Sequence, residues 1–150
     1  IKEFDKDEFV FVESESAKIG RLTIPRPIFS SIYNSKLIKI NNKVEFRIKF
    51  LIDEYQNLIQ DHKPLFRLIE ILKSRISKDE IAQIENAISE KKFQNLARYL
   101  LHYHYDNAYN LSMSKRKGEI VKEFNFSCDV ENAIEHVCNN IISNEAFLRG

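Results

Sequence analysis

Glycine and cysteine are scarce in this 150-residue chain, and each scarcity excludes a class of protein. The three glycines are Gly20, Gly118 and Gly150, and they form no phosphate-binding loop of the type G-x-x-x-x-G-K-[ST]. Such a loop needs closely spaced glycines, because its backbone amides must approach the phosphates. We therefore do not expect the chain by itself to be an independent nucleoside triphosphatase. Cys128 and Cys138 are too few for a disulfide framework, so a reducing cytoplasm is the expected location.

The chain also lacks an excess of charge and a long apolar run. The chain has 23 Lys and Arg residues and 22 Asp and Glu residues, which gives a net charge of +1 at pH 7. Any anion site must therefore be a local patch, since no overall field attracts nucleic acid or membrane. No apolar run reaches the roughly 18 residues of a membrane span, so we expect no membrane association. Because the sequence begins with Ile1 rather than Met, we expect a processed product or part of a longer protein.

The chain does have the hydrophobic pattern of a small, helix-rich α/β domain. Apolar and β-branched runs predict strands over residues 9–13, 36–40 and 119–127. Apolar residues at helical spacing predict helices over residues 27–35, 43–60, 65–72, 77–88, 91–104 and 129–142. Strands separated by helices favour a parallel sheet, here a small one with a helical block packed on it. Three strands are few for such a sheet, so we expect further strands before Ile1. The connecting residues 14–26 and 106–118 are predicted to be loops.

The first predicted strand ends in acids and is followed by cations. Ligands of open parallel sheets bind beyond the carboxyl ends of the strands, where Glu13 is expected to lie. Glu15 is two residues further and faces the same way on an extended chain. These acids are candidates for orienting Mg²⁺, and Lys18 and Arg21 are candidates for binding an anion. The alternative is a strand end with solvated charges, which is common.

A second group of candidates lies in the stretch LARYLLHYHYDNAY and the basic loop after it. Tyrosine can stack on bases, and arginine and lysine attract the phosphate backbone. The alternative is that Tyr99 and Tyr103 belong to the core and that the basic run KRK is a solvated loop. The candidate RNA-binding residues are Arg98, Tyr105, Asp106, Tyr109, Lys115 and Arg116.

A single arginine and a possible metal site complete the candidates. Arg47 follows the second predicted strand and would face the ligand crevice, although a surface ion pair is an alternative. The pairs His102/His104 and His136/Cys138 match no ordinary zinc spacing, so no zinc site is expected. A magnesium ion bound through Glu13 is the remaining metal candidate.

Three segments together resemble the tRNA 2-selenouridine synthases. VFVESESAKIGRLTIP is similar to that family's hydrophobic strand followed by E-S-E-S, I-G-R and L-P. KINNKVEFRIKFLIDEY resembles its strand-to-helix segment with an arginine before a leucine-rich helix. LLHYHYDNAYNLS resembles L-L-x-x-Y-Y-D-P-x-Y, with His104 in place of the first Tyr and Asn107 in place of Pro. The three segments keep the family's order and span residues 9 to 112.

The resemblance implies a cytoplasmic transferase that acts on the wobble uridine of tRNA. The family replaces the sulfur of 2-thiouridine with selenium from selenophosphate, after the sulfur has been geranylated with geranyl diphosphate. The whole enzyme joins a rhodanese-like domain with a reactive cysteine to a P-loop domain that binds ATP or GTP. Residues 1–150 match the C-terminal half of that P-loop domain, so the phosphate loop and the reactive cysteine are expected upstream. The resemblance places Glu13 and Glu15 at the nucleotide or diphosphate site.

The resemblance also implies partners, and it leaves rival functions. We expect tRNA and the upstream part of the protein as partners, Mg²⁺ in the whole enzyme, no cofactor held by this chain alone, and no catalysis by it. The orphaned edge of a truncated sheet favours a homodimer. Half of another P-loop kinase or nucleotide-binding protein is one alternative function. A non-catalytic helical interaction module is the other.

Overall fold

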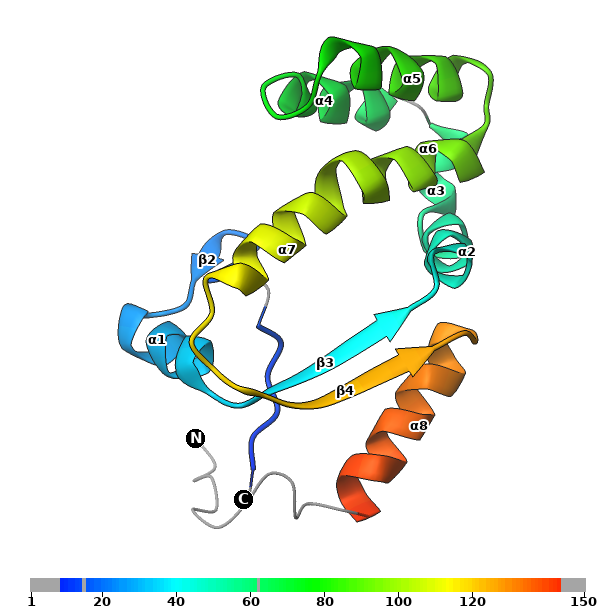
Figure 1. Cartoon of the computed structure of the whole chain (residues 1–150). Coiled ribbons are helices and arrows are strands. Elements are labelled where there is room, and N and C mark those ends of the chain that lie inside the picture. The colour runs from blue at the N-terminus through cyan, green and yellow to red at the C-terminus, as the bar shows by residue number, and fades with distance from the viewer. Residues whose placement is uncertain (1–8, 15, 62, 144–150) are drawn as a thin grey trace.

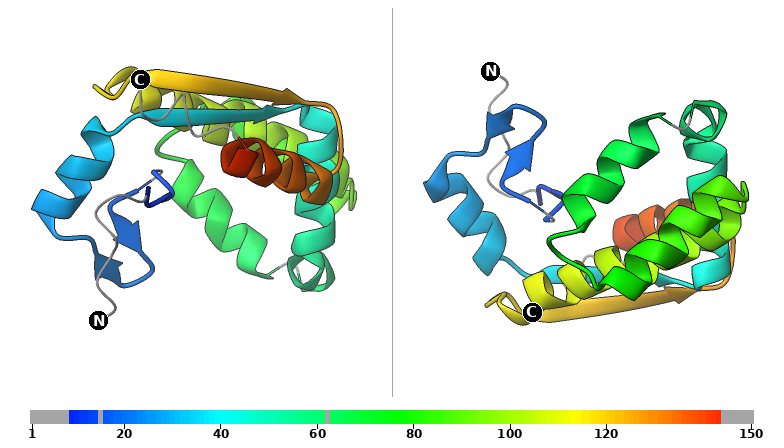
Figure 2. Two further views of the ribbon diagram at one scale, coloured as in Figure 1. Left: turned by 90° about the horizontal axis from the view of Figure 1, so that it is seen from below. Right: turned by 90° about the horizontal axis from the view of Figure 1, so that it is seen from above.

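A computed structural model describes residues 9–14, 16–61 and 63–143 of the chain (Figures 1 and 2). The fold is helix-rich α/β with small sheets, one of them parallel, which confirms the predicted class. The elements in chain order are β1 (Lys18–Ile19), β2 (Leu22–Thr23), α1 (Arg26–Asn34), β3 (Leu37–Asn42), α2 (Val44–Glu54), α3 (Gln56–Gln60), α4 (Lys63–Leu72), α5 (Lys78–Ser89), α6 (Phe93–Leu100), the π-helix η1 (Leu101–Tyr105), α7 (Asp106–Ser114), β4 (Ile120–Phe126) and α8 (Val130–Ser143).

Strands β3 and β4 form the parallel sheet and correspond to the second and third predicted strands. Ile40 pairs with Phe124 in this register, and the connection between the two strands is the helical block α2 to α7. One face of the sheet is apolar, where buried Phe124 lies edge-on against His136 of α8. The other face is polar, because Asn41 Nδ2 donates to Glu123 Oε1 at 2.6 Å. Only one face is therefore apolar, although parallel sheets are usually covered on both faces.

The first predicted strand is wrong in the structure. Residues 9–14 are not in a strand, and Phe9 and Val12 are 40% and 54% exposed. Strand propensity expresses packing against neighbouring strands, and no described strand lies beside this segment to supply it. The predicted loop that follows contains the small antiparallel hairpin β1–β2. Its turn includes Gly20 at a φ of 60°, a conformation that glycine adopts without strain.

The helical block has two apolar clusters, both built from the stripes read in the sequence. The larger cluster joins α4, α5 and α6 around Ile69, Ile84 and Ile88, each at most 2% exposed. The smaller cluster joins α2 to α6 and η1 through Ile48, Ala97 and Leu101. Because α6 contributes to both clusters, it connects α4 and α5 to α2, the helix that follows β3.

Two helix boundaries differ from prediction. The helix expected over residues 43–60 is interrupted at Tyr55, between α2 and α3. The loop expected over residues 106–118 is helical as far as Ser114, because α7 continues directly from η1 and Asp106 is held by an arginine of α2. Asn and Ser are weak helix formers, so tertiary contacts decide this segment. Within the described residues, no helix is both long enough and apolar enough to cross a membrane.

Candidate functional site

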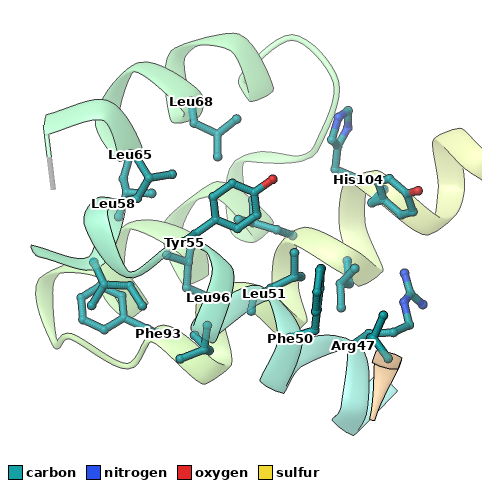
Figure 3. A pocket seen from close by; sticks show the side chains of 17 residues that line it. Arg47, Phe50, Leu51, Tyr55, Leu58, Leu65, Leu68, Phe93, Leu96 and His104 are labelled. Atoms are coloured by element: carbon teal, nitrogen blue, oxygen red, sulfur yellow. The ribbon is translucent and has the colours of Figure 1, made fainter. Parts of the chain in front are cut away.

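An apolar cavity of about 600 Å³ lies among the helices of the block (Figure 3). Its walls come from α2, α3, α4, α6 and η1, with one residue from the start of α8. Small-molecule sites typically have about 300–1,000 Å³ and are mostly apolar with a few polar groups. The lining residues are Arg47, Phe50, Leu51, Ile52, Tyr55, Leu58, Ile59, Leu65, Leu68, Phe93, Leu96, Ala97, Leu100, Leu101, His104, Tyr105 and Val130.

The side chains of Arg47 and His104 lie at one end of this cavity, whereas its aromatic rings are spread along it (Figure 3). Arg47 donates two hydrogen bonds to Asp106, from Nη2 to Oδ1 at 2.6 Å and from Nη1 to Oδ2 at 3.2 Å. The guanidinium carbon also lies 5.8 Å from the ring centre of Tyr105. His104 lines the same end, as Figure 3 shows. The structure thus brings together the predicted residues Arg47, Tyr105 and Asp106, of which the last two come from a distant motif.

The π-helix η1 forms the wall at this polar end. It spans Leu101–Tyr105 between two α-helices and includes His104 and Tyr105. Single π turns are rare and occur often at functional sites. The aromatic stack extends beyond it, since the rings of Tyr105 and Tyr109 are 6.3 Å apart and nearly parallel at 11°.

The candidate residues of the N-terminal segment lie elsewhere. Glu13 borders a second hollow, between residues 9–14 and β3. Lys18 and Arg21 are exposed in the β1–β2 hairpin and do not line that hollow. Glu15 lies outside the described residues. The structure therefore does not bring the two cations to Glu13 in one hollow.

The basic candidates after α6 have different surroundings from one another. Arg98 is half exposed and lies 3.7 Å from Glu45, as in an ordinary surface ion pair. Lys115 is exposed. Arg116 is partly buried and donates to the backbone oxygens of Ser14 at 3.1 Å and Ile32 at 2.9 Å. The guanidinium of Arg116 is therefore engaged inside the molecule, whereas the other two side chains reach solvent.

Metal-binding groups are sparse in the part of the chain that the structure describes. No cluster of three or more His, Cys, Asp or Glu side chains capable of holding a metal is found there. Cys128 and Cys138 are both free thiols. A magnesium ion is commonly held by one or two carboxylates together with substrate phosphates. Glu13, the carboxylate predicted for this role, is exposed at the border of the second hollow.

Sequence reasoning missed the cavity because it read the apolar residues of 43–60 as core. Phe50 and Tyr55 line the cavity and are 39% and 49% exposed, so they do not pack fully. One signal was available, since Phe46 and Phe50 lie outside the stripe that runs through Val44 and Ile48. An apolar surface wider than one stripe indicates more than a single packed face.

Comparisons with known proteins identify one relationship. A family model described as the tRNA 2-selenouridine synthase AAA domain matches residues 1–140. No curated protein and no solved structure matches the chain.

Proposed function

The chain belongs to the tRNA 2-selenouridine synthase AAA domain family, and we propose that it serves a transferase that exchanges the sulfur of wobble 2-thiouridine for selenium. The proposed route passes through a geranylated thiouridine, with geranyl diphosphate and selenophosphate as the co-substrates. In this proposal the chain supplies the site for the prenyl group. Selenophosphate chemistry and the reactive cysteine belong to other parts of the enzyme.

The observation that carries this proposal is the apolar cavity with its polar end. A geranyl chain is a flexible hydrocarbon without hydrogen-bonding groups, so an apolar cavity of about 600 Å³ suits it by size and chemistry. Burying the chain there removes apolar surface from water, which is the main source of affinity for such a ligand. The diphosphate would then lie at the end that carries Arg47 and His104.

Arg47 is the natural contact for the diphosphate. A guanidinium recognises phosphate through paired N–H groups, and the two Nη atoms of Arg47 presently donate to Asp106. Asp106 fixes the orientation of the guanidinium and offsets its charge. An arriving diphosphate would bind the remaining N–H groups or replace the carboxylate, so affinity depends on both residues.

The remaining candidates take supporting roles in the proposal. Glu13 borders the second hollow and not the cavity, so a magnesium ion held by its carboxylate would lie outside the end formed by Arg47 and His104. Tyr105 and Tyr109 form a stacked pair near the polar end and are suited to hold the base of the tRNA. Exposed Lys18, Arg21, Arg98 and Lys115 would contribute attraction to the tRNA backbone. The chain alone is expected to bind the prenyl ligand without turning it over.

Thermal denaturation with three ligands tests the proposal. A ligand that binds only the folded state raises the midpoint. Geranyl diphosphate should raise it most, geraniol less, and inorganic pyrophosphate least, because the hydrocarbon provides most of the affinity. A cavity-filling change, Leu68→Trp, should abolish the shifts, whereas Phe66→Trp on the exposed side of the same helix should preserve them.

Other outcomes would assign a different function. A shift with pyrophosphate as large as with geranyl diphosphate would indicate an anion site without prenyl recognition. A shift with Mg-ATP alone would favour a nucleotide-binding or kinase role. Indifference to all of these ligands and to tRNA would contradict the proposal and favour a helical interaction module.

A further inference from the structure

Acidic residues are missing from one long stretch of the sequence. Between Glu15 and Glu45 there is no Asp or Glu, although the same stretch contains six cations. They are Lys18, Arg21, Arg26, Lys36, Lys39 and Lys43. All 22 acidic residues lie in the rest of the chain, which is therefore net negative. The overall charge of +1 thus conceals a local basic patch, which is the form that an anion site must take in a nearly neutral chain.

Three of these cations lie on the β1–β2 hairpin and at the start of α1. Figures 1 and 2 show both elements at the edge of the molecule opposite α2 and α3. Lys18, Arg21 and Arg26 are exposed, and no ion pair within the described ranges includes them. Lys39, by contrast, is paired with Glu123 at 3.3 Å. The hairpin and the start of α1 therefore present positive charge that is available to an anionic partner.

The tip of the hairpin is apolar as well as basic. Ile19 pairs with Leu22 across the two strands, so their side chains lie next to each other on one face. They are 64% and 74% exposed, the highest fractions among the large apolar side chains of the described residues. A hairpin of two-residue strands is marginal by itself, and these two side chains contribute little burial to it. Paired apolar side chains rimmed by cations are typical of an interaction surface.

This combination of side chains fits an unpaired segment of RNA better than a duplex. Side chains do not reach the bases in the narrow major groove of an RNA helix, whereas the bases of a loop can be separated. Isoleucine and leucine are among the side chains that proteins insert between neighbouring bases, and lysine and arginine bind phosphates. Aliphatic side chains form no hydrogen bonds with bases, so such an insertion separates the bases without distinguishing them.

We propose that the β1–β2 hairpin is a wedge that enters the anticodon loop of the tRNA substrate. Ile19 and Leu22 insert between the wobble uridine and the base that follows it, while Lys18 and Arg21 bind the neighbouring phosphates. An enzyme that acts on a base takes that base out of its stack, and an apolar wedge keeps the base from stacking again. The inference rests on the proposed action on a wobble uridine, and it assigns the exposure of that base to one element of the fold.

Fluorescence of an anticodon stem-loop RNA tests the wedge with the 150-residue chain. 2-Aminopurine replaces the base that follows the wobble uridine, because its fluorescence rises when stacking is lost. Saturating this RNA with the chain should raise the fluorescence several-fold. RNA affinity is measured separately, by the anisotropy of an end-labelled copy of the RNA, so that binding and unstacking are distinguished.

Matched variants separate the apolar part of the tip from the basic part. Ile19→Thr and Leu22→Thr together should remove most of the fluorescence rise at saturation, since threonine keeps strand propensity but provides less apolar surface. Leu22→Met keeps the apolar surface and should retain the rise. Ile71→Thr, at a 58% exposed position of α4, should also retain it. Arg21→Gln should instead lower the affinity and reduce the slope of its salt dependence by about one phosphate contact, with the rise at saturation unchanged.

Several results would overturn the wedge. Binding of the RNA without a fluorescence rise would contradict it and leave the proposed function in place. A rise that survives the double substitution would assign the unstacking to another element. Absence of RNA binding would also overturn it, as would Ile19- and Leu22-dependent sedimentation with phosphatidylserine vesicles when the RNA stays stacked. Failure of the proposed function is recognised separately, because geranyl diphosphate would then leave the thermal midpoint unchanged.

Discussion

Lys115 and Arg116 are neighbours in one basic run, yet the structure gives them different surroundings. Lys115 is exposed, while the guanidinium of Arg116 bonds two backbone oxygens and lies 5.3 Å from the ring centre of Tyr33. Its Nε is buried without a hydrogen-bond partner in the described structure. This cost offsets part of the stability that the two hydrogen bonds of the guanidinium provide. Arg116 thus joins the segment before β1, helix α1 and the turn before β4. The basic run in the sequence does not show which of its side chains is exposed and which is bonded inside the molecule.

We expect Arg116→Ala to lower the free energy of unfolding by about 1.5–3 kcal/mol, because hydrogen bonds from a charged group are lost. Lys115→Ala should change it by less than about 0.5 kcal/mol, as is usual for exposed side chains. Urea denaturation of the two variants measures both values. Equal effects of the two substitutions would contradict the internal role of Arg116. In contrast, tRNA affinity should fall with Lys115→Ala, since that side chain remains available to phosphate.

Gly118 shows a second constraint that composition alone does not reveal. A Cβ built at this position would lie 1.9 Å from the backbone oxygen of Ser35, in the turn between α1 and β3. Because backbone atoms cannot move aside cheaply, Gly118→Ala should cost about 1–3 kcal/mol, as is typical of overpacking. The free energy of unfolding from urea denaturation provides the test.

Gly20 supplies the control for that substitution. It has a positive φ but open space around the position of a Cβ, and Asn tolerates this conformation. Gly20→Asn should therefore be nearly neutral. If Gly118→Ala were equally neutral, the close approach of the two turns would be wrong.

Helix α5 begins with a capping box, which the S-x-x-E spacing of Ser77 and Glu80 indicates in the sequence and the structure confirms. Ser77 accepts a hydrogen bond from the Glu80 amide, and Glu80 accepts one from the Ser77 amide at 2.7 Å. The hydrogen bond from the Ser77 backbone is the main cause that lowers the pKa of the Glu80 carboxyl below its ordinary value of 4.5. The stabilising effect of the charged carboxylate is therefore complete above that ordinary value, and it is lost as the pH falls through the lowered pKa.

Thermal melts across acid pH test this linkage. Near neutral pH, Glu80→Ala should melt at a lower temperature than the parent chain, because the cap is gone. The difference should shrink as the pH falls below about 4, where the parent's carboxylate also becomes protonated. Glu85→Ala serves as the control, because it removes a carboxylate of the same helix that takes no part in the cap. A difference that stays constant down to about pH 2 would contradict the contribution of the ionised cap.

The elements that the sequence predicted are those whose determinants are local. The strands expected at 36–40 and 119–127 appear as β3 and β4, and the capping box marks the start of α5. The segment at 9–13 has strong strand propensity but no neighbour, so local preference alone does not make it a strand. Residues 106–114 have weak helix propensity, yet contacts with α2 hold them in a helix.

The candidate site could be predicted only in its parts. The sequence indicated Arg47 and Asp106 separately, but they are 59 residues apart and nothing local predicts their pairing. The aromatic and aliphatic residues of the cavity were visible as apolar stripes. Whether such stripes close on each other or leave a space depends on how the helices cross, which is a property of their packing.

The sheet and its helix α8 meet the helical block through α2, which follows β3 directly and contacts α8, and α2 packs in turn on α6 and η1. This chain of contacts makes the stability of the sheet and of the block interdependent. A two-stranded sheet with one covering helix is marginal by itself, so β3, β4 and α8 depend on the helices that follow β3. Ile84→Ala in the larger cluster should cost about 2–5 kcal/mol, because Ile84 is 1% exposed and the substitution leaves a cavity. Such a loss is a large part of the stability of an ordinary domain, about 5–15 kcal/mol.

Native-state hydrogen exchange shows whether that loss reaches the sheet. If the molecule unfolds as one unit, Ile84→Ala should accelerate exchange in β4 by the same factor as in α5. Ile71→Ala, at a 58% exposed position of the neighbouring helix α4, should change neither. Faster exchange in α5 with unchanged exchange in β4 would show that the helical block opens without the sheet. In that case the junction at Ile48, Ala97 and Leu101 would be too weak to couple them, and the cavity could open while the sheet stays folded.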